Sequence, residues 1–345
     1  MAEHRHLAEI DPEFAKLPRP PTAVGPIDLD AFRSNFATKV LPAMQAASKG
    51  LLPPESEYQV TDHLIEVQDG VKAPARVITP ATQQEDGKFP LLFWLHAGGR
   101  SITISLHAKR KDNRLGYRFI LGGLDMDDYF LRRLAVDHQI VVVNFDYSLA
   151  PEHPFPIPVD DSFAALKHIA ANQEEFSADL SKGFIVSGQS AGANIAAVLA
   201  HLALKEPVFK QHPLTGQFLM YPLVVHPSAY PEKFASSLLS YNELTDVVGL
   251  TKGTMDSLWA FYKPEPSDPR ASPLLFPSHG GLPPTYVQVA GMDPLRDEGL
   301  LYEKVLKEAG VKTKVDVYPG VPHGFHMINP QLEIAQKQSK DTKAG

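Results

Sequence analysis

A serine between two glycines constrains this chain more than any other feature of its sequence. Residues 188–192 read Gly-Gln-Ser-Ala-Gly, after an apolar run at 184–187 and before a helical pattern at 191–204. A strand, a G-x-S-x-G turn and a helix together are typical of a nucleophile elbow. Glycine is needed on both sides of the serine because larger side chains would collide with the neighbouring strand or helix. Such a turn exposes the Ser190 hydroxyl at the carboxyl end of the strand and aims the first N–H groups of the helix at the same place.

The length and charge of the chain limit its fold class and its partners. Its 345 residues suffice for one large α/β domain with an accessory piece. The net charge of −7 argues against a nucleic-acid partner, because phosphate binding requires clustered positive charge. No uninterrupted apolar stretch reaches the length of a membrane span, about 18 residues, and residues 1–21 lack the apolar core of a signal peptide. We therefore expect a cytoplasmic protein without stable membrane insertion.

Several short runs along the chain are apolar at every position, without alternating polar residues. Such runs predict strands that are buried on both faces, as in a parallel sheet. Strands are expected at 91–95, 140–145, 184–187, 217–221, 285–290 and 314–318, and a hairpin at 58–67 and 72–79. Helical patterns lie between them at 129–136, 159–171, 191–204 and 297–309. Strands that alternate with helices predict a doubly wound α/β sheet, in which a ligand lies outside the carboxyl ends of the strands.

Two helical stretches do not join this alternation. Residues 27–49 carry apolar side chains at helical spacing, and residues 227–262 are also expected to be largely helical. They are either ordinary surface helices or a cap over the edge of the sheet. Their spacing alone leaves both interpretations open.

A histidine and an aspartate follow two later strands at the point where each strand ends. A serine nucleophile needs a base within hydrogen-bond reach, and the base needs a carboxylate that orients it. Asp293 comes just after the expected strand 285–290, and His323 comes just after 314–318. The order Ser, Asp, His is the order in which α/β-hydrolases supply these groups. The sequence therefore predicts a triad of Ser190, Asp293 and His323 at one edge of the sheet.

Small residues after the strand 91–95 complete the predicted site. Residues 96–99 read His-Ala-Gly-Gly, and small side chains there let backbone N–H groups approach a substrate oxygen. We expect the N–H groups of Gly98, Gly99 and Ala191 to form an oxyanion hole, in which each donor contributes a factor of about 10²–10³ in turnover.

With these motifs in place, the chain resembles the hormone-sensitive-lipase-like family of α/β-hydrolase esterases. Members carry the segments HGGG, YRLAPEH, GDSAGG, DPLRDEG and HGF. This sequence reads HAGG at 96–99, YSLAPEH at 147–153, GQSAGA at 188–193, DPLRDEG at 293–299 and HGF at 323–325. The order and rough spacing of these segments match from about residue 91 to residue 325, which is most of the chain.

The resemblance implies a fold, a set of roles and a division of the chain. It implies an α/β-hydrolase fold, with a mostly parallel eight-stranded sheet flanked by helices under a helical cap. It implies Ser190 as nucleophile, His323 as base and Asp293 as the residue that orients the base. The cap would be built from residues 1–50 and an insertion at 225–265, and the hydrolase core would comprise residues 51–224 and 266–345.

The sequence departs from the family pattern around the site. Ala97 replaces the first glycine of HGGG, Gln189 replaces the usual aspartate, and Ala193 replaces the final glycine of the elbow. Arg100 stands where an aromatic residue is common. None of these changes removes a catalytic atom, but each could reshape the acyl pocket. The connection 101–128 is long and basic, with a run of cations at Lys109, Arg110, Lys111, Arg114 and Arg118. This loop, 106–118, is either a solvated face or a lid that attracts acidic substrates.

Other titratable residues compete for these roles. His326 is a rival base, although the motif favours His323. Asp297 and Glu298 are rival carboxylates, but they begin a helix and are expected to interact with its N-terminus. His96 is expected to brace the oxyanion loop rather than to take part in the chemistry. The remaining histidines lack the spacing of metal ligands, and the absence of cysteine excludes thiolate ligands and disulfides, so we expect no metal and no cofactor.

These observations predict a serine hydrolase that cleaves carboxylic esters with short to medium acyl chains through an acyl-enzyme. Two alternatives remain open. One is a biosynthetic lactonase, deacetylase or cyclase that acts on a specialised natural product. The other is a non-catalytic small-molecule receptor on the same fold, which the presence of all three triad residues disfavours. The expected partner is a small-molecule ester, and the sequence leaves open whether the chain forms a homodimer.

Overall fold

A computed structural model of the chain describes residues 4–18, 28–81, 87–98 and 123–344. Eight strands form one sheet in the order β1-β2-β4-β3-β5-β6-β7-β8. The strands are β1 (Tyr58–Gln68), β2 (Val71–Pro80), β3 (Leu91–Leu95), β4 (Val141–Phe145), β5 (Phe184–Gln189), β6 (Gly216–Met220), β7 (Thr285–Ala290) and β8 (Thr313–Tyr318). The pairs from β4 through β8 are parallel, whereas β2 is antiparallel to both β1 and β4. The predicted eight-stranded, mostly parallel α/β-hydrolase sheet is therefore confirmed.

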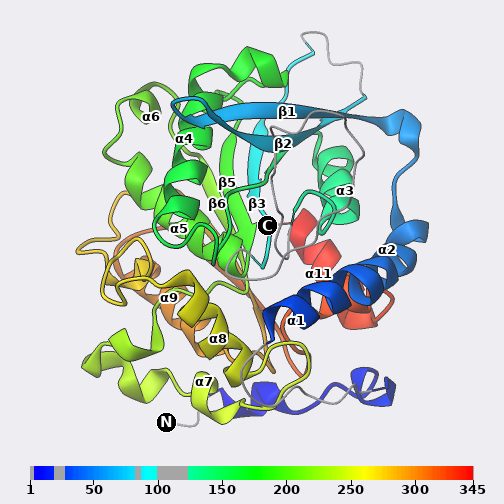
Figure 1. Cartoon of the computed structure of the whole chain (residues 1–345), viewed down its shortest axis with the longest axis vertical. Coiled ribbons are helices and arrows are strands. Elements are labelled where there is room, and N and C mark those ends of the chain that lie inside the picture. Colours follow the sequence, from blue (N-terminus) through cyan, green and yellow to red (C-terminus); the bar gives the residue numbers. More distant parts are fainter. Residues whose placement is uncertain (1–3, 19–27, 82–86, 99–122, 345) are drawn as a thin grey trace.

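The parallel strands are buried because helices cover both faces of the sheet (Figure 1). On β3, Leu91, Phe93 and Leu95 belong to one apolar cluster, and Leu92 and Trp94 belong to another. The first cluster includes residues of α4 (Ile157–Ala171), α5 (Ala191–Ala203) and α9 (Arg296–Glu308), and the second includes residues of α3 (Asp128–His138) and α11 (Glu333–Lys343). Alternate side chains of a strand point to opposite faces, so an apolar run without alternation is what a three-layer sandwich requires.

The remaining elements are short. They are η1 (Arg5–Ala8), η2 (Phe14–Lys16), α1 (Leu29–Asn35), η3 (Phe36–Val40), α2 (Leu41–Ser48), η4 (Lys49–Leu51), η5 (Glu55–Glu57), η6 (Gln173–Phe176), α6 (Val208–Gln211), η7 (Pro227–Ala229), η8 (Glu232–Ser237), α7 (Ser240–Glu243), α8 (Lys252–Tyr262), η9 (Pro273–Leu275) and α10 (Phe325–Ile328). The stretch 227–262 is largely helical, as expected, but it is divided into four segments, of which α8 is the longest.

The two helical stretches outside the alternation pack beside the loops that follow the strands. In the later stretch, Tyr241, Trp259 and Tyr262 form an apolar cluster with Leu223 and Leu295, which follow β6 and β7. In the earlier stretch, the Arg33 guanidinium of α1 donates to the Glu152 carboxylate at 2.9 Å. Both stretches therefore contact segments near the carboxyl ends of the sheet. The cap boundaries 1–50 and 225–265 stay a prediction.

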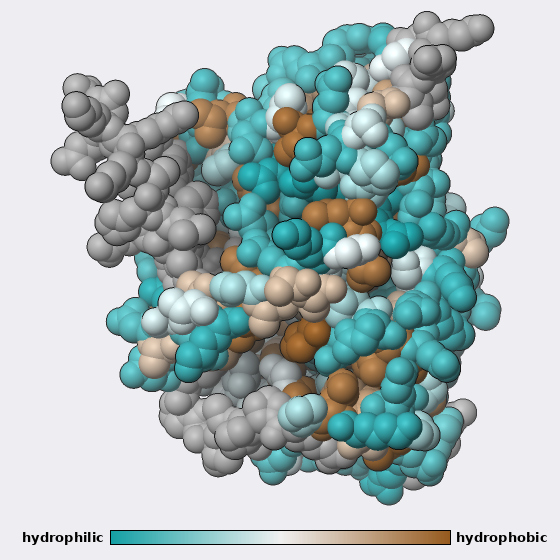
Figure 2. All heavy atoms as spheres, turned by 90° about the vertical axis from the view of Figure 1, so that its right-hand side faces the viewer, coloured by the Kyte–Doolittle hydropathy of each residue, from teal (hydrophilic) through white to brown (hydrophobic). Residues whose placement is uncertain are grey.

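The side of the molecule that carries α2, α3 and α11 is mostly hydrophilic, and hydrophobic atoms are visible there in small separate areas (Figure 2). Within the described residues, no helix combines the length and the apolar character that crossing a membrane requires.

Candidate active site

Ser190 occupies a strained turn between β5 and α5. Its backbone lies at φ 56° and ψ −116°, outside the regions that residues other than glycine normally adopt. Its N–H donates to the Met220 carbonyl at the end of β6, at 2.8 Å. A Cβ added to Gly188 would lie 2.5 Å from the carbonyl carbon of Gly192, and one added to Gly192 would lie 1.9 Å from the Leu95 oxygen. Both glycines are required because neighbouring backbone passes directly against them, as the G-x-S-x-G pattern indicates.

We expect Gly192→Ala to destabilise the protein by about 3 kcal/mol or more, because the new methyl group overlaps backbone of β3 that cannot move without distorting the sheet. Urea unfolding of wild type and variant measures the difference. Gly50→Ala is the matched control, since a Cβ there meets nothing within 4 Å. An equal effect of both substitutions would contradict this account of the elbow.

His323 and Asp293 are in direct contact. The His323 Nδ1 atom lies 2.6 Å from Asp293 Oδ2, and the other carboxylate oxygen accepts the Leu295 N–H at 2.9 Å. The Asp293 side chain is 1% exposed and the His323 side chain is 12% exposed. Because a buried carboxylate can only accept, His323 Nδ1 carries the hydrogen, which leaves Nε2 with a free lone pair. The carboxylate therefore holds the imidazole in the tautomer that a general base requires.

Tyr221 lies between the elbow and the histidine loop. It follows Met220, whose carbonyl binds the Ser190 N–H, and the centre of its ring lies 5.3 Å from that of His323. Burial raises the pKa of its hydroxyl well above the ordinary value, so the phenol stays neutral. Tyr221 belongs to no recognised motif, but it ends the expected strand 217–221, at the same edge of the sheet as Asp293 and His323.

The rival base His326 is committed to another buried network. Gln338 donates to the Tyr221 hydroxyl at 2.6 Å, so the Tyr221 hydrogen points to His326 Nδ1 at 3.1 Å. Burial, together with the charge of the neighbouring His323, lowers the pKa of His326 to about 3. His326 is therefore a neutral acceptor whose Nδ1 lone pair is already used.

The rival carboxylates hold the backbone of other segments. Asp297 Oδ2 accepts the N–H groups of Leu239 and Ser240 at 2.9 and 2.7 Å, and Glu298 Oε2 accepts those of Val224 and Val225 at 2.7 and 3.2 Å. The expectation that they serve the N-terminus of their own helix misses these partners, which come from distant parts of the chain. Both carboxylates fix the loops around the site.

The loop that the sequence predicts to supply oxyanion donors begins with a buried histidine between two acceptors. His96 is fully buried, its Nδ1 faces the Ala97 carbonyl at 2.9 Å, and its Nε2 faces Asp146 Oδ1 at 3.3 Å. Both neighbours are acceptors, an arrangement that favours hydrogen on both ring nitrogens and therefore the protonated form of His96. Burial opposes this charge, but the hydrogen bond and charge of Asp146, the Ala97 carbonyl and the charge of Asp127 together raise the pKa above its ordinary value.

The same cluster fixes the backbone of the loop. The Ala97 N–H is hydrogen-bonded to the Asp127 carboxylate, and the Tyr147 hydroxyl donates to the His96 carbonyl at 2.8 Å. Gly98 adopts φ 82°, which favours glycine. These contacts agree with the expectation that His96 braces the loop. Gly99 and the basic loop 106–118 lie outside the described residues.

The raised pKa of His96 predicts a specific pH dependence of stability. A basic group whose pKa is higher in the folded state contributes stability that is present below its ordinary pKa of about 6.5 and is lost as the pH rises through the folded value. We expect the difference in unfolding free energy between wild type and His96→Asn to shrink from pH 6 to pH 9. Urea titrations across this range measure it. A difference that grows with pH would show that His96 is neutral in the fold.

An apolar cluster rich in methionine lies beside these loops. Met44, Met126 and Met327 pack with Ala97, and Phe36 and Val40 of the N-terminal helices join them. Gln189, next to the serine, donates its amide N–H to the Met327 sulfur at 3.4 Å and is fully buried. Its Oε1 atom has no hydrogen-bond partner among the described residues. Flexible thioethers fill irregular gaps, so this cluster packs the N-terminal helices against the loop that starts at His96.

Comparison with known proteins identifies the family. A family model described as an alpha/beta hydrolase fold matches residues 116–327. The chain belongs to the α/β-hydrolase family. Within it, the motifs resemble those of the hormone-sensitive-lipase-like group, and that recognition is confirmed.

Two curated relatives of this α/β hydrolase are esterases. The versiconal hemiacetal acetate esterase of Dothistroma septosporum is 34% identical over 83% of this chain and 79% of its own length. The carboxylesterase NlhH of Mycobacterium tuberculosis is 34% identical over 79% of this chain and 78% of its own length. A solved structure of vibralactone cyclase is 39% identical and covers 99% of this chain and 94% of that chain, with a TM-score of 0.88.

Proposed function

We propose that this α/β hydrolase is a serine hydrolase that cleaves carboxylic esters with short to medium acyl chains. The proposal rests chiefly on the 2.6 Å contact between His323 Nδ1 and Asp293 Oδ2, at the same edge of the sheet as the strained Ser190 turn. The esterase relatives support it. In this proposal Ser190 is the nucleophile, His323 is the base, and Asp293 orients and stabilises the imidazole.

The proposed reaction has two steps. Ser190 Oγ attacks the ester carbonyl while His323 Nε2 takes its proton, and the tetrahedral oxyanion is stabilised by the N–H groups of Gly98, Gly99 and Ala191. His323 then protonates the leaving alcohol, and water hydrolyses the acyl-enzyme by the same route. Asp293 stabilises the imidazolium that forms in each step. Apart from this water, the proposed steps use only groups of the chain.

Active-site labelling tests this proposal. The purified protein is incubated with a fluorophosphonate, the modified peptide is located by mass spectrometry, and hydrolysis of p-nitrophenyl acetate and butyrate is followed in parallel. We expect label on Ser190 and release of nitrophenol. Absence of both would favour the receptor function instead, because a receptor needs neither an activated serine nor turnover.

A second candidate is a biosynthetic enzyme that acts on a specialised natural product as a lactonase, deacetylase or cyclase. The likeness to vibralactone cyclase across nearly the whole chain favours it. Product analysis with hydroxy-acyl esters and lactones separates the two. Lactone formation in excess of free acid would identify a cyclase.

The location and the domain boundaries belong to the same proposal. Residues 1–50 and 225–265 would act as a cap around the ester, and residues 51–224 and 266–345 would form the catalytic core. A cytoplasmic location stays a prediction.

A further inference from the structure

The N-terminal strap, residues 5–17, lies against the two loops that carry the proposed acid and base. Its backbone brackets Gly320, which precedes His323 by three residues. The Gly320 N–H donates to the Leu7 carbonyl at 2.8 Å, and the Gly320 carbonyl accepts the Asp11 N–H at 3.0 Å. Backbone bonds to both sides of one residue fix its position more closely than a side-chain contact does.

The strap also presses against the aspartate loop. A Cβ added to Gly291, two residues before Asp293, would lie 2.0 Å from the Leu7 carbonyl oxygen. One added to Gly320 would lie 2.3 Å from the Asp11 nitrogen, and Gly320 has φ 71°. Both loops therefore have a glycine where the strap crosses them. The Leu7 carbonyl lies between the two loops and contacts both.

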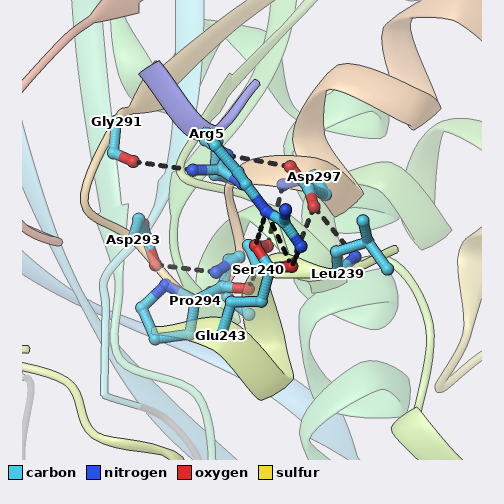
Figure 3. A network of polar contacts seen from close by, with 10 residues as sticks. Arg5, Leu239, Ser240, Glu243, Gly291, Asp293, Pro294 and Asp297 are labelled. Atoms are coloured by element: carbon cyan, nitrogen blue, oxygen red, sulfur yellow. Dashed lines mark hydrogen bonds and ion pairs between the residues drawn. The ribbon is translucent and has the colours of Figure 1, made fainter. Parts of the chain in front are cut away.

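The outer end of the strap is tied to the helices of the later helical stretch (Figure 3). The Arg5 guanidinium pairs with the Glu243 carboxylate of α7, with Nε at 3.0 Å from Oε1. From the same helix, the Ser240 hydroxyl donates to the Pro294 carbonyl at 2.7 Å, directly after Asp293. Arg296, 2% exposed, donates to the Gly291 carbonyl at 3.3 Å. The aspartate loop is thus held from both sides.

The inner end of the strap is anchored in the core. Phe14 is 4% exposed and belongs to the same apolar cluster as Tyr318, Val321 and Phe325, which flank the histidine loop. Asp11 Oδ1 accepts the N–H groups of Glu13 and Phe14 at 2.9 and 2.8 Å, which sets the turn between the bonded part of the strap and this anchor.

We propose that the strap is a positioning element that sets the distance and alignment between Asp293 and His323. This inference rests on the proposed function for its effect on turnover. The dependence of the Asp293–His323 contact on residues 5–17 can be tested without any substrate. The residues concerned touch neither substrate nor reacting atoms, and they act through Gly291 and Gly320.

Two full-length variants and one conservative control test the strap. Gly320→Ala forces the Asp11 backbone away, and a displacement of about 1 Å costs about 10²-fold in turnover. Asp11→Ala removes the turn contacts without adding atoms, and we expect kcat to fall about tenfold with KM within about threefold. Asp11→Asn keeps an acceptor oxygen for both N–H groups and should restore wild-type kcat. Each rate is divided by the concentration of sites that react with the fluorophosphonate, and it is measured well below the unfolding temperature of the variant.

A readout independent of catalysis distinguishes this inference from the proposed function. The His323 Nδ1–H proton, held in a short hydrogen bond, should give a far-downfield proton NMR signal that is lost in Asp293→Asn. We expect the signal to shift or broaden in Gly320→Ala and Asp11→Ala and to persist in Asp11→Asn. If Gly320→Ala does not fold, the NMR signal and kcat of Asp11→Ala test the inference alone. An unchanged signal and unchanged kcat in a folded Asp11→Ala protein would overturn the inference. A wild type that shows the signal but hydrolyses no ester would overturn only the proposed function.

Discussion

Replacing Ser190 by alanine is expected to reduce kcat/KM for p-nitrophenyl esters by roughly 10⁶-fold while the protein stays folded. The alanine removes the only atom that forms the acyl-enzyme bond, and the residual rate comes from the oxyanion donors and from substrate binding. The strained turn carries no side-chain cap, so loss of the hydroxyl removes no hydrogen bond that supports α5. Substrate KM should therefore change little. Steady-state kinetics and fluorophosphonate labelling measure the effect.

Ser187→Ala is the matched control for this substitution. Ser187 lies on the same strand, is fully buried, and donates its hydroxyl to the Phe218 carbonyl at 2.9 Å. Its loss should cost about 1 kcal/mol of stability through that hydrogen bond and leave turnover per folded molecule unchanged. If Ser187→Ala abolished activity and Ser190→Ala did not, the nucleophile would be misassigned.

The sheet and the loops of the site could be predicted because their signals are local. Each buried parallel strand is a continuous apolar run, and each proposed catalytic residue follows the end of such a run. The glycines of the elbow are visible in the sequence because they belong to the local G-x-S-x-G pattern, although the backbone that crowds Gly192 comes from the end of β3. Asp146 follows the expected strand 140–145 by one residue, and the same rule could have identified it as a partner of His96.

The strap could not be predicted from its own sequence. Residues 5–17 carry apolar side chains at helical spacing at Leu7, Ile10, Phe14 and Leu17, and they are predicted only as part of the cap 1–50, because this pattern does not show which segments they contact. Their bonds to Gly320 join backbone atoms, which leave no trace in residue type. Gly291 and Gly320 were visible only as loop glycines, because the segment that crowds them is about 300 residues away in the chain. Long-range backbone contacts of this kind appear only in the folded chain.

The stretch 227–262 is largely helical, as expected, but its breaks could not be predicted for a related reason. Its apolar residues at helical spacing do pack, but they do so from short pieces. Asp297 takes the N–H groups of Leu239 and Ser240, and Pro231 interrupts the helical pattern before η8. A carboxylate from a distant helix thus accepts the first N–H groups of α7 and fixes where that helix begins. Side-chain periodicity alone does not reveal this long-range cap.

Asp293→Asn is expected to lower kcat by about 10⁴-fold while the geometry of the loop is preserved. The reason lies in how the carboxylate is bonded. One oxygen accepts the Leu295 N–H at 2.9 Å, so the asparagine must place its own oxygen there and turn its amide N–H₂ group toward His323 Nδ1. A donor at that position selects the tautomer with hydrogen on Nε2. The lone pair needed to accept the Ser190 proton is then lost.

The measurement combines kinetics with stability and labelling. We expect an unfolding free energy within about 2 kcal/mol of wild type, since the loop keeps the bond to Leu295, together with fluorophosphonate labelling that slows in proportion to kcat. Asp316→Asn serves as the control, because its carboxylate accepts the Tyr286 hydroxyl at 2.7 Å on β8 and does not touch the histidine. Activity of Asp293→Asn within tenfold of wild type would mean that another group orients His323, because an imidazole with hydrogen on Nε2 cannot accept the Ser190 proton.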